Sequence, residues 1–309
     1  MDYAARMSDQ SSGIALAEQV ETRLRAALAE GDAAVAGVGA VLRHLLATPG
    51  GSLFSDEIVA RLQGLALDLA RQFMPDVERE RREALAAALL ADRDILVHLH
   101  ALCVETSVTL DLEARCGLDP ALSPLLRDMV ADASEDVAIA AMQGLTAQAQ
   151  FMQRQTRMAV LLSDLPSEKF ERALDIFAEQ GVDAEEKTPT LRDAKDGNGC
   201  RARRLSALVE SLDAGDLRAL DIDNAGIAIF LSALHVHLGI PRDEATLLLS
   251  PSHALRLALS LRVAGLDPTE AERQLSILHG DIALPDGWDR LSDDTAGELV
   301  VMGGESRNG

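Results

Sequence analysis

The chain has 309 residues and carries 50 acidic against 29 basic side chains, a net charge of −21. This charge argues against nucleic acid or an anionic membrane surface as the main partner, because binding to either depends on neutralising negative charge; it favours solubility and is compatible with a basic partner. Aromatic residues make up only 3% of the chain and alternating runs of Val, Ile and Thr are missing, which argues against a β-sandwich and favours stacked helices rich in Ala and Leu.

The first third of the sequence predicts a flexible start followed by a series of helices. Residues 1–13 are polar and are expected to form a flexible N-terminus. An N-terminal helical region then covers residues 14–117, in which Gly31, the run Pro49-Gly50-Gly51 and Gly117 separate amphipathic segments. Caps and helix breakers place its helices at residues 14–30, 32–48, 55–74, 77–91 and 92–116.

The stretch from Ser134 to Phe177 predicts two consecutive helices and organises the second region. Ser134 supplies a capping oxygen and the next two residues are acidic, which favours a helix start. At 100° per residue, the apolar residues share one broad face: Val137, Ala141, Leu145, Phe151, Met152, Met158, Ala159 and Leu162. We therefore expect one long helix, a turn at residues 165–168 and a second helix over residues 167–180.

Two glutamines, Gln148 and Gln155, lie seven residues apart in the middle of this apolar face. A buried amide without partners costs about 1–3 kcal/mol, so each must be satisfied in some way. In one interpretation the helix is only half covered there and the amides touch water. In the other they form a polar seam that fixes the register against a neighbouring helix or a second subunit.

Residues 183–200 interrupt the helical pattern because they are polar and end in Asp196-Gly197-Asn198-Gly199. We expect a helix start at Asp183 followed by a surface loop; a partner-binding loop is the alternative, although no particular residue supports it. The helical pattern resumes over residues 201–212, where the opening Arg-Ala-Arg-Arg run is expected to be a solvated face.

A weak internal repeat marks the C-terminal part. Gly239 and Gly265 lie 26 residues apart, and Pro241 and Pro268 lie 27 apart. Each Gly is expected to end one helix and each Pro to open the next, a spacing typical of stacked helical hairpins. Residues 118–290 are thus expected to form a HEAT-like helical region containing the 183–200 loop, followed by a tail over 291–309.

The segments AAMQGLTAQAQFMQRQTRM, LSDLPSEKFERALDIF and DIDNAGIAIFLSAL, all in the second region, also carry a resemblance. Together they resemble an all-helical bacterial family of unknown function whose fold is HEAT-like, over about residues 122–290. The resemblance implies stacked helical hairpins. It brings no catalytic motif and therefore implies no activity.

Histidine pairs and cysteines are the residues of this sequence that could form a chemical site. His98 and His100, like His235 and His237, lie two apart in predicted helices and point about 200° apart, so neither pair is expected to hold a metal. Cys103 shares an apolar face and is expected to be a core thiol rather than a nucleophile. No cofactor motif occurs, so no cofactor is expected.

The expected location is the cytoplasm. The three cysteines form no C-x-x-C motif, which fits a reducing compartment, and no signal peptide is recognisable. The uncharged stretch over residues 224–241 is short and interrupted by polar residues and Pro241, so we expect a buried helix rather than a membrane span.

These observations predict an all-α protein of stacked, HEAT-like helical hairpins with an N-terminal helical bundle. Its expected function is that of a non-enzymatic protein–protein interaction or scaffold protein, regulatory in a bacterial cytoplasm. The expected partner is a protein, with a homodimer as an open possibility. Arg154 and Arg157, on the polar face of the central helix, are the candidate partner-binding residues; the alternative is that they are solubilising surface charges.

Two other functions are also compatible with the sequence. One is a histidine phosphotransfer module centred on His44 or His98. The other is a sensor that holds an apolar small molecule between helices.

Overall fold

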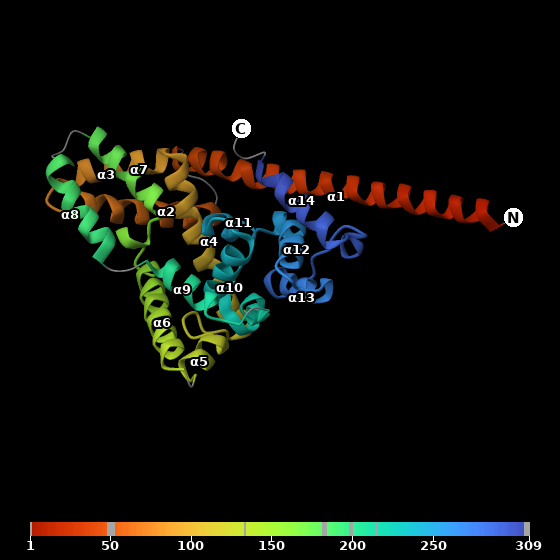
Figure 1. Cartoon of the computed structure of the whole chain (residues 1–309). Coiled ribbons are helices and arrows are strands. Elements are labelled where there is room, and N and C mark those ends of the chain that lie inside the picture. The colour runs from red at the N-terminus through yellow and green to blue at the C-terminus, as the bar shows by residue number, and fades with distance from the viewer. Residues whose placement is uncertain are drawn as a thin grey trace. The chain divides into compact units, whose positions relative to one another are not determined.

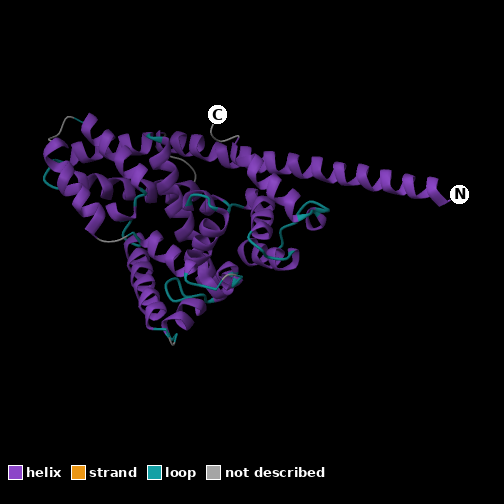
Figure 2. Ribbon diagram, viewed as in Figure 1, coloured by secondary structure: helices purple, strands orange, loops and turns teal. Residues whose placement is uncertain are grey.

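The computed structural model describes residues 2–47, 53–132, 134–180, 184–197, 200–213 and 215–305. Helices joined by turns and loops make up this part of the chain, and no strand occurs in it (Figure 2). The all-α prediction is therefore confirmed. The chain divides into two compact units, one formed by residues 1–37 with 248–309 and the other by residues 38–247.

These units differ from the regions 14–117 and 118–290 expected from the sequence. The reason lies in the larger unit, where α4 (Arg93–Cys116) packs against α10 (Ile222–Leu238) and α11 (Arg242–Leu247). Helices from both expected regions therefore share one interior. Charged side chains on these helices meet there, as described below.

One core of the larger unit is formed by helices that surround Phe73. α2 (Leu53–Phe73), α3 (Arg79–Ala91), α4, α7 (Ser167–Glu179) and α8 (Ala184–Gly197) contribute its residues. The Phe73 ring is fully buried, with its centroid 6.4 Å from that of Phe170 and 5.5 Å from that of Phe177. The apolar stripes of these amphipathic helices supply the remaining buried residues, mostly leucine and alanine.

A second group of helices completes the larger unit: α5 (Pro124–Val130), α6 (Glu135–Gln155), α9 (Arg201–Glu210), α10 and α11. α9 packs against both α6 and α10 (Figure 1). Gly144 permits this approach, because a Cβ atom there would overlap Cδ1 of Leu208. Within α10 the helical backbone breaks at Gly226, whose φ of 68° and ψ of 164° are readily available only to glycine.

The smaller unit combines residues 2–37 of α1 (Asp2–Ala47) with α12 (Ala254–Val263), α13 (Pro268–His279) and α14 (Asp293–Glu305). Arg256 donates two hydrogen bonds to the carboxylate of Asp32, at 2.9 and 2.6 Å. The Trp288 side chain is buried, and its indole Nε1 donates to Glu272 of α13 at 3.2 Å. The guanidinium of Arg262 donates to the backbone oxygen of Trp288 at 3.0 Å.

Several predicted helix ends are confirmed. Asp92 caps α4 by accepting hydrogen bonds from the backbone N–H groups of Asp94 and Ile95, and Gly117 ends the helix in a left-handed conformation. Gly239 ends α10 in the same way, and Pro268 is the first residue of α13. Local capping chemistry is therefore enough to place these boundaries.

Other boundaries differ from the prediction. α1 is continuous, so residues 2–13 are helical and the predicted break at Gly31 is wrong. Gly31 serves packing instead, since a Cβ atom there would overlap the backbone oxygen of Ser252. Residues 184–197, predicted as mostly a surface loop, form α8, because Leu191 is buried in the core and Lys195 donates to the Leu165 oxygen at 2.6 Å. The ends of the predicted loop, 183 and 198–199, lie outside the described residues.

One helix of the described residues, α4, is long and apolar enough to cross a membrane by length and composition. Of its most apolar window, 61% is buried inside the protein, which is the setting of a core helix. α10, the uncharged helix expected to be buried, has nearly every residue from Ile222 to Leu234 buried.

Candidate functional site

The candidate site begins where α6 ends, because the helix is shorter than predicted. After Gln155 the backbone N–H of Ala159 donates to the Arg154 oxygen at 3.0 Å, and that of Met158 donates to the Gln155 oxygen at 3.1 Å. This pair of bonds is a Schellman motif, in which the residue at the Met158 position must be left-handed. Met158 has φ of 51°, the only positive φ among the described non-glycine residues.

A left-handed backbone costs a non-glycine residue roughly 1–2 kcal/mol, so the Met158 side chain needs a compensating contact. Gly64 of α2 provides it. An added Cβ at Gly64 would lie 2.6 Å from Sδ and 2.7 Å from Cβ of Met158, well inside van der Waals contact. Met158 therefore rests directly on the α2 backbone at a position that only glycine leaves open.

Two side chains of α2 hold the segment that follows. Asp68 Oδ2 accepts a hydrogen bond from the backbone N–H of Val160 at 3.1 Å, and Gln72 Nε2 donates to the backbone oxygen of the same residue at 2.6 Å. Gln72 Nε2 also donates to Asp68 Oδ2 at 2.9 Å, which links the two side chains. This polar clamp satisfies both backbone groups of Val160 where no helix can do so.

The turn and α2 enclose an open cleft with a volume of about 690 Å³. Leu67 and Met158 lie in it, and these residues are 39% and 38% exposed. Three arginines, Arg71, Arg154 and Arg157, line the same cleft beside a single carboxylate, that of Asp68. The volume lies in the range of ligand pockets, and the lining combines apolar surface with an excess of positive charge.

The three arginines differ in how firmly they are held. Arg71 donates to Asp68 Oδ1 at 2.7 Å, and half-buried Arg154 donates to Gln150 Oε1 at 3.3 Å. Arg157 is exposed, and its guanidinium makes no hydrogen bond or ion pair with any part of the chain that the structure describes. The cleft therefore contains at least one guanidinium whose donors face solvent.

The two arginines predicted to bind a partner, Arg154 and Arg157, thus line one cleft together. The sequence did not point to the other lining residues Leu67, Arg71 and Gln72, because they come from a helix about 85 positions earlier in the chain. The signal that bears on them is Gly64 within a helical pattern, since an isolated helical glycine often marks a close approach.

A buried network of charges lies elsewhere in the larger unit, between α4, α9 and α11. Glu105 is 2% exposed and accepts two parallel hydrogen bonds from Arg201, at 2.8 and 2.9 Å. Arg242 donates to the same carboxylate at 2.9 Å and to Ser232 Oγ at 2.6 Å. Arg201 also stacks on the Phe151 ring, with its Cζ 3.6 Å from the centroid.

The two guanidiniums determine the charge state of Glu105. Burial by itself raises the pKa of this carboxyl, but the fields and hydrogen bonds of Arg201 and Arg242 outweigh burial and hold the pKa at about 2. Glu105 is therefore ionised at neutral pH. This network joins helices distant in sequence and is a structural centre rather than an open site, because Glu105 and Arg201 are buried and the Arg242 side chain is only 13% exposed.

This network corrects one prediction and decides between two others. The expectation that the Arg-Ala-Arg-Arg run is a solvated face is wrong for Arg201, which is 5% exposed. Gln148 and Gln155 are both 2% exposed, so the interpretation that their amides touch water is wrong. Gln148 instead joins α6 to α9 by accepting from Arg201 at 2.8 Å, and Gln155 donates to the Ala159 oxygen at 3.5 Å. The polar seam is confirmed at Gln148.

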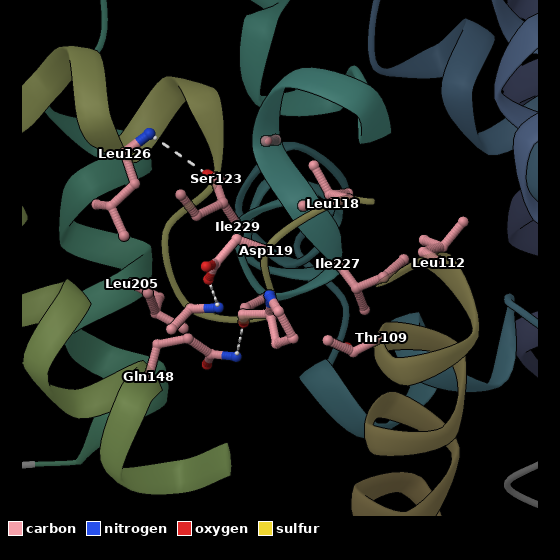
Figure 3. Close-up of a pocket in the computed structure, with 15 residues that line it drawn as sticks. Thr109, Leu112, Leu118, Asp119, Ser123, Leu126, Gln148, Leu205, Ile227 and Ile229 are labelled. Carbon is pink, nitrogen blue, oxygen red and sulfur yellow. Dashed lines mark hydrogen bonds between the residues drawn. The ribbon is translucent and has the colours of Figure 1, made fainter. Parts of the chain in front are cut away.

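A small cavity lies beside the network, between α4, α5, α6, α9 and α10 (Figure 3). Gln148 and Asp119 are among its polar lining residues, and Gln148 Nε2 donates to the Pro120 oxygen at 2.9 Å on its wall. Its volume of about 10 Å³ suffices for roughly one water molecule. This cavity is therefore too small for the apolar ligand considered from the sequence.

The histidines and Cys103 occupy defined positions. His98 is buried, and its Nδ1 lies 2.9 and 3.0 Å from the two carboxylate oxygens of Asp243. The imidazole ring is therefore not exposed to a phosphoryl donor. The His44 side chain lies outside the described residues. Cys103 is buried as expected, and burial raises the pKa of its thiol to about 12. Within the described part of the chain, no three His, Cys, Asp or Glu side chains are grouped to hold a metal ion.

Comparison of the chain with protein-family models, with curated proteins and with solved structures found no match. The candidate function therefore rests on the geometry and charge of the cleft.

Proposed function

We propose that this chain is a helical protein-interaction module, and that the cleft between α2 and the Met158 turn is its binding site. The supporting observation is the cleft lining: Arg71, Arg154 and Arg157 lie around exposed Leu67 and Met158. Arginine is enriched at protein interfaces, where its guanidinium can pair with carboxylates and its stem packs on apolar groups. A regulatory or scaffolding role in a bacterial cytoplasm belongs to the same proposal.

The proposed arrangement of the helices is that of irregular stacked hairpins, as in HEAT-like proteins. The packing of α9 against both α6 and α10 supports this view, since each helix buries an apolar stripe on its neighbours. Such stacks commonly present binding surfaces formed by successive helices rather than by one loop. The cleft fits that pattern because α2 and the end of α6 form it jointly.

The test uses a photo-crosslinking residue in place of Leu67, with the same residue at Val301, which is 64% exposed, as the control position. We expect the Leu67 position to crosslink one protein in lysate of the source organism. That protein is then purified, and its affinity for the unmodified chain is measured by calorimetry.

Charge reversal locates the binding site. The double variant Arg154→Glu/Arg157→Glu is expected to weaken binding of the purified partner at least tenfold per arginine, about 1.4 kcal/mol each. The matched control is Arg79→Glu/Arg127→Glu, which changes the net charge equally at two exposed positions outside the cleft. Equal loss of affinity in both double variants would show a long-range charge effect and contradict the proposed site.

A further inference from the structure

The charge of the cleft is opposite to that of the chain. The whole protein has a net charge of −21, yet the cleft lining holds three arginines and one aspartate. Asp68 is already committed, because Arg71, Gln72 and the Val160 N–H all donate to its carboxylate. The cleft therefore offers unmatched positive charge, chiefly that of Arg157, to any group that enters it.

The short range of screened charge interactions indicates what kind of molecule can bind in the cleft. At physiological ionic strength interactions between exposed charges are screened within about 8 Å, so a short anionic segment in the cleft responds mainly to the arginines around it. A large polyanion such as nucleic acid or an anionic bilayer spans many screening lengths and meets the acidic remainder of the surface. The arrangement therefore favours a small occupant that carries only a few negative charges.

The apolar part of the cleft adds a second requirement. Leu67 and Met158 are exposed side by side with the arginines, and Met158 is fixed on Gly64 at the cost of a left-handed backbone. A methionine held in this way presents a polarisable apolar surface that adapts to different side chains. An occupant that buries it needs an apolar side chain between its negative groups.

We infer that the cleft binds a short acidic peptide segment of a partner protein, with carboxylates on Arg71, Arg154 and Arg157 and an apolar side chain on Leu67 and Met158. This inference rests on the proposed function and specifies the chemistry of its partner. Carboxylates form bidentate, charge-assisted hydrogen bonds with guanidinium groups, which gives the segment both affinity and orientation. The apolar side chain removes Leu67 and Met158 from water.

The test follows the methyl group of Met158 by NMR in protein labelled at its methionine methyl groups. The signal is assigned by its loss in Met158→Leu. Met142, which lies in α6 outside the cleft and is 49% exposed, provides the control methyl group. The probe is a synthetic peptide with a central leucine between glutamate pairs; in one matched peptide glutamine replaces glutamate, and in another alanine replaces leucine.

We expect the acidic peptide to shift the Met158 signal and not the Met142 signal, with an affinity at least tenfold above that of either matched peptide. Arg157→Gln is expected to remove most of this difference, whereas Arg127→Gln leaves it unchanged. Raised salt should weaken binding of the acidic peptide but not binding of the glutamine peptide, because only the acidic peptide forms ion pairs with the arginines.

Three results would overturn the inference. They are equal binding of the acidic and glutamine peptides, no peptide binding at all, and a Met158 shift that depends on the concentration of the protein alone, which would identify a second copy as the occupant. None of these three results by itself contradicts the proposed function. A crosslinked partner whose binding requires Arg154 and Arg157 but whose bound segment lacks acidic residues would sustain the proposed function and reject the acidic peptide.

Discussion

The buried charge network and the cleft use the same residue type for opposite purposes. Arg201 and Arg242 are enclosed, and their donors are directed to Glu105, Gln148 and Ser232. Arg157 lies at the surface with its donors turned to solvent. Enclosed arginines must be matched inside the fold because an unpaired buried charge is very costly, whereas exposed arginines contribute little to stability. We therefore expect changes at Arg201 or Arg242 to lower stability, and changes at Arg157 to affect only the proposed binding.

The largest expected effect follows from removing the carboxylate of the network. Glu105→Ala leaves the two guanidiniums of Arg201 and Arg242 buried without their counter-ion, which should lower the free energy of unfolding by about 3–5 kcal/mol. Chemical denaturation followed by circular dichroism measures this loss.

The matched control replaces the whole network with apolar residues, as Glu105→Leu/Arg201→Met/Arg242→Met. Because no charge is then left unpaired, this triple variant should be far more stable than Glu105→Ala. If the single variant lost less than about 1 kcal/mol, the network would not be the structural centre described above.

The next effect concerns the same group at low pH. The folded pKa of Glu105 is about 2, below its ordinary value of 4.5, so its contribution to stability is fully present above pH 4.5. That contribution is lost as the pH falls from 4.5 towards 2, because the unfolded chain takes up the proton first. Unfolding free energies measured across this range should fall more steeply in the native chain than in Glu105→Gln. Parallel curves for the two proteins would contradict the assignment.

A smaller loss is expected at the cleft wall. Gly64→Ala places a Cβ atom against Sδ and Cβ of Met158, and Met158 cannot simply swing away because its own Cβ is involved. Overpacking of this kind costs about 1–3 kcal/mol and should displace the Met158 methyl signal. Gly37→Ala is the control, since a Cβ there meets no atom within 4 Å and the exchange should stabilise the helix slightly. An unchanged methyl signal in Gly64→Ala would show that the contact is not maintained.

The smallest effect on stability is expected from the two arginines that we propose to bind the partner. Arg154→Glu/Arg157→Glu should change the free energy of unfolding by no more than about 0.5 kcal/mol, because neither side chain forms an ion pair in the described structure. Thermal unfolding measures this change alongside the loss of partner affinity. A large loss of stability would mean that Arg154 and Arg157 stabilise the fold. The cleft would then not differ from the buried network in this respect.

Much of the fold could be predicted from local signals in the sequence. Asp92, Gly117, Gly239 and Pro268 act through hydrogen bonds and backbone preferences within a few residues, and the helix boundaries predicted from them are confirmed. The continuity of α1 through Gly31 could not be predicted in this way, because the glycine serves a contact with Ser252 far along the chain.

The candidate site could be predicted only in part. The polar face of one predicted helix points to Arg154 and Arg157, but their neighbours on α2 depend on tertiary packing. The burial of Arg201 cannot be predicted locally, because an arginine-rich run at a helix start ordinarily faces solvent and the counter-ion Glu105 lies 96 residues away. Pairing of this kind is a property of the folded interior and leaves no local pattern.

The polar clamp on Val160 has a consequence for how the cleft can change. Asp68 and Gln72 hold the backbone N–H and C=O of that residue, groups that every amino acid except proline supplies in full. The hydrogen bonds that hold this wall of the cleft therefore do not depend on the other side chains that line it. Substitutions at Leu67, Arg157 or Leu161 can therefore change the charge and apolar surface of the cleft while its frame persists, which makes this surface a suitable starting point for engineering a binding site.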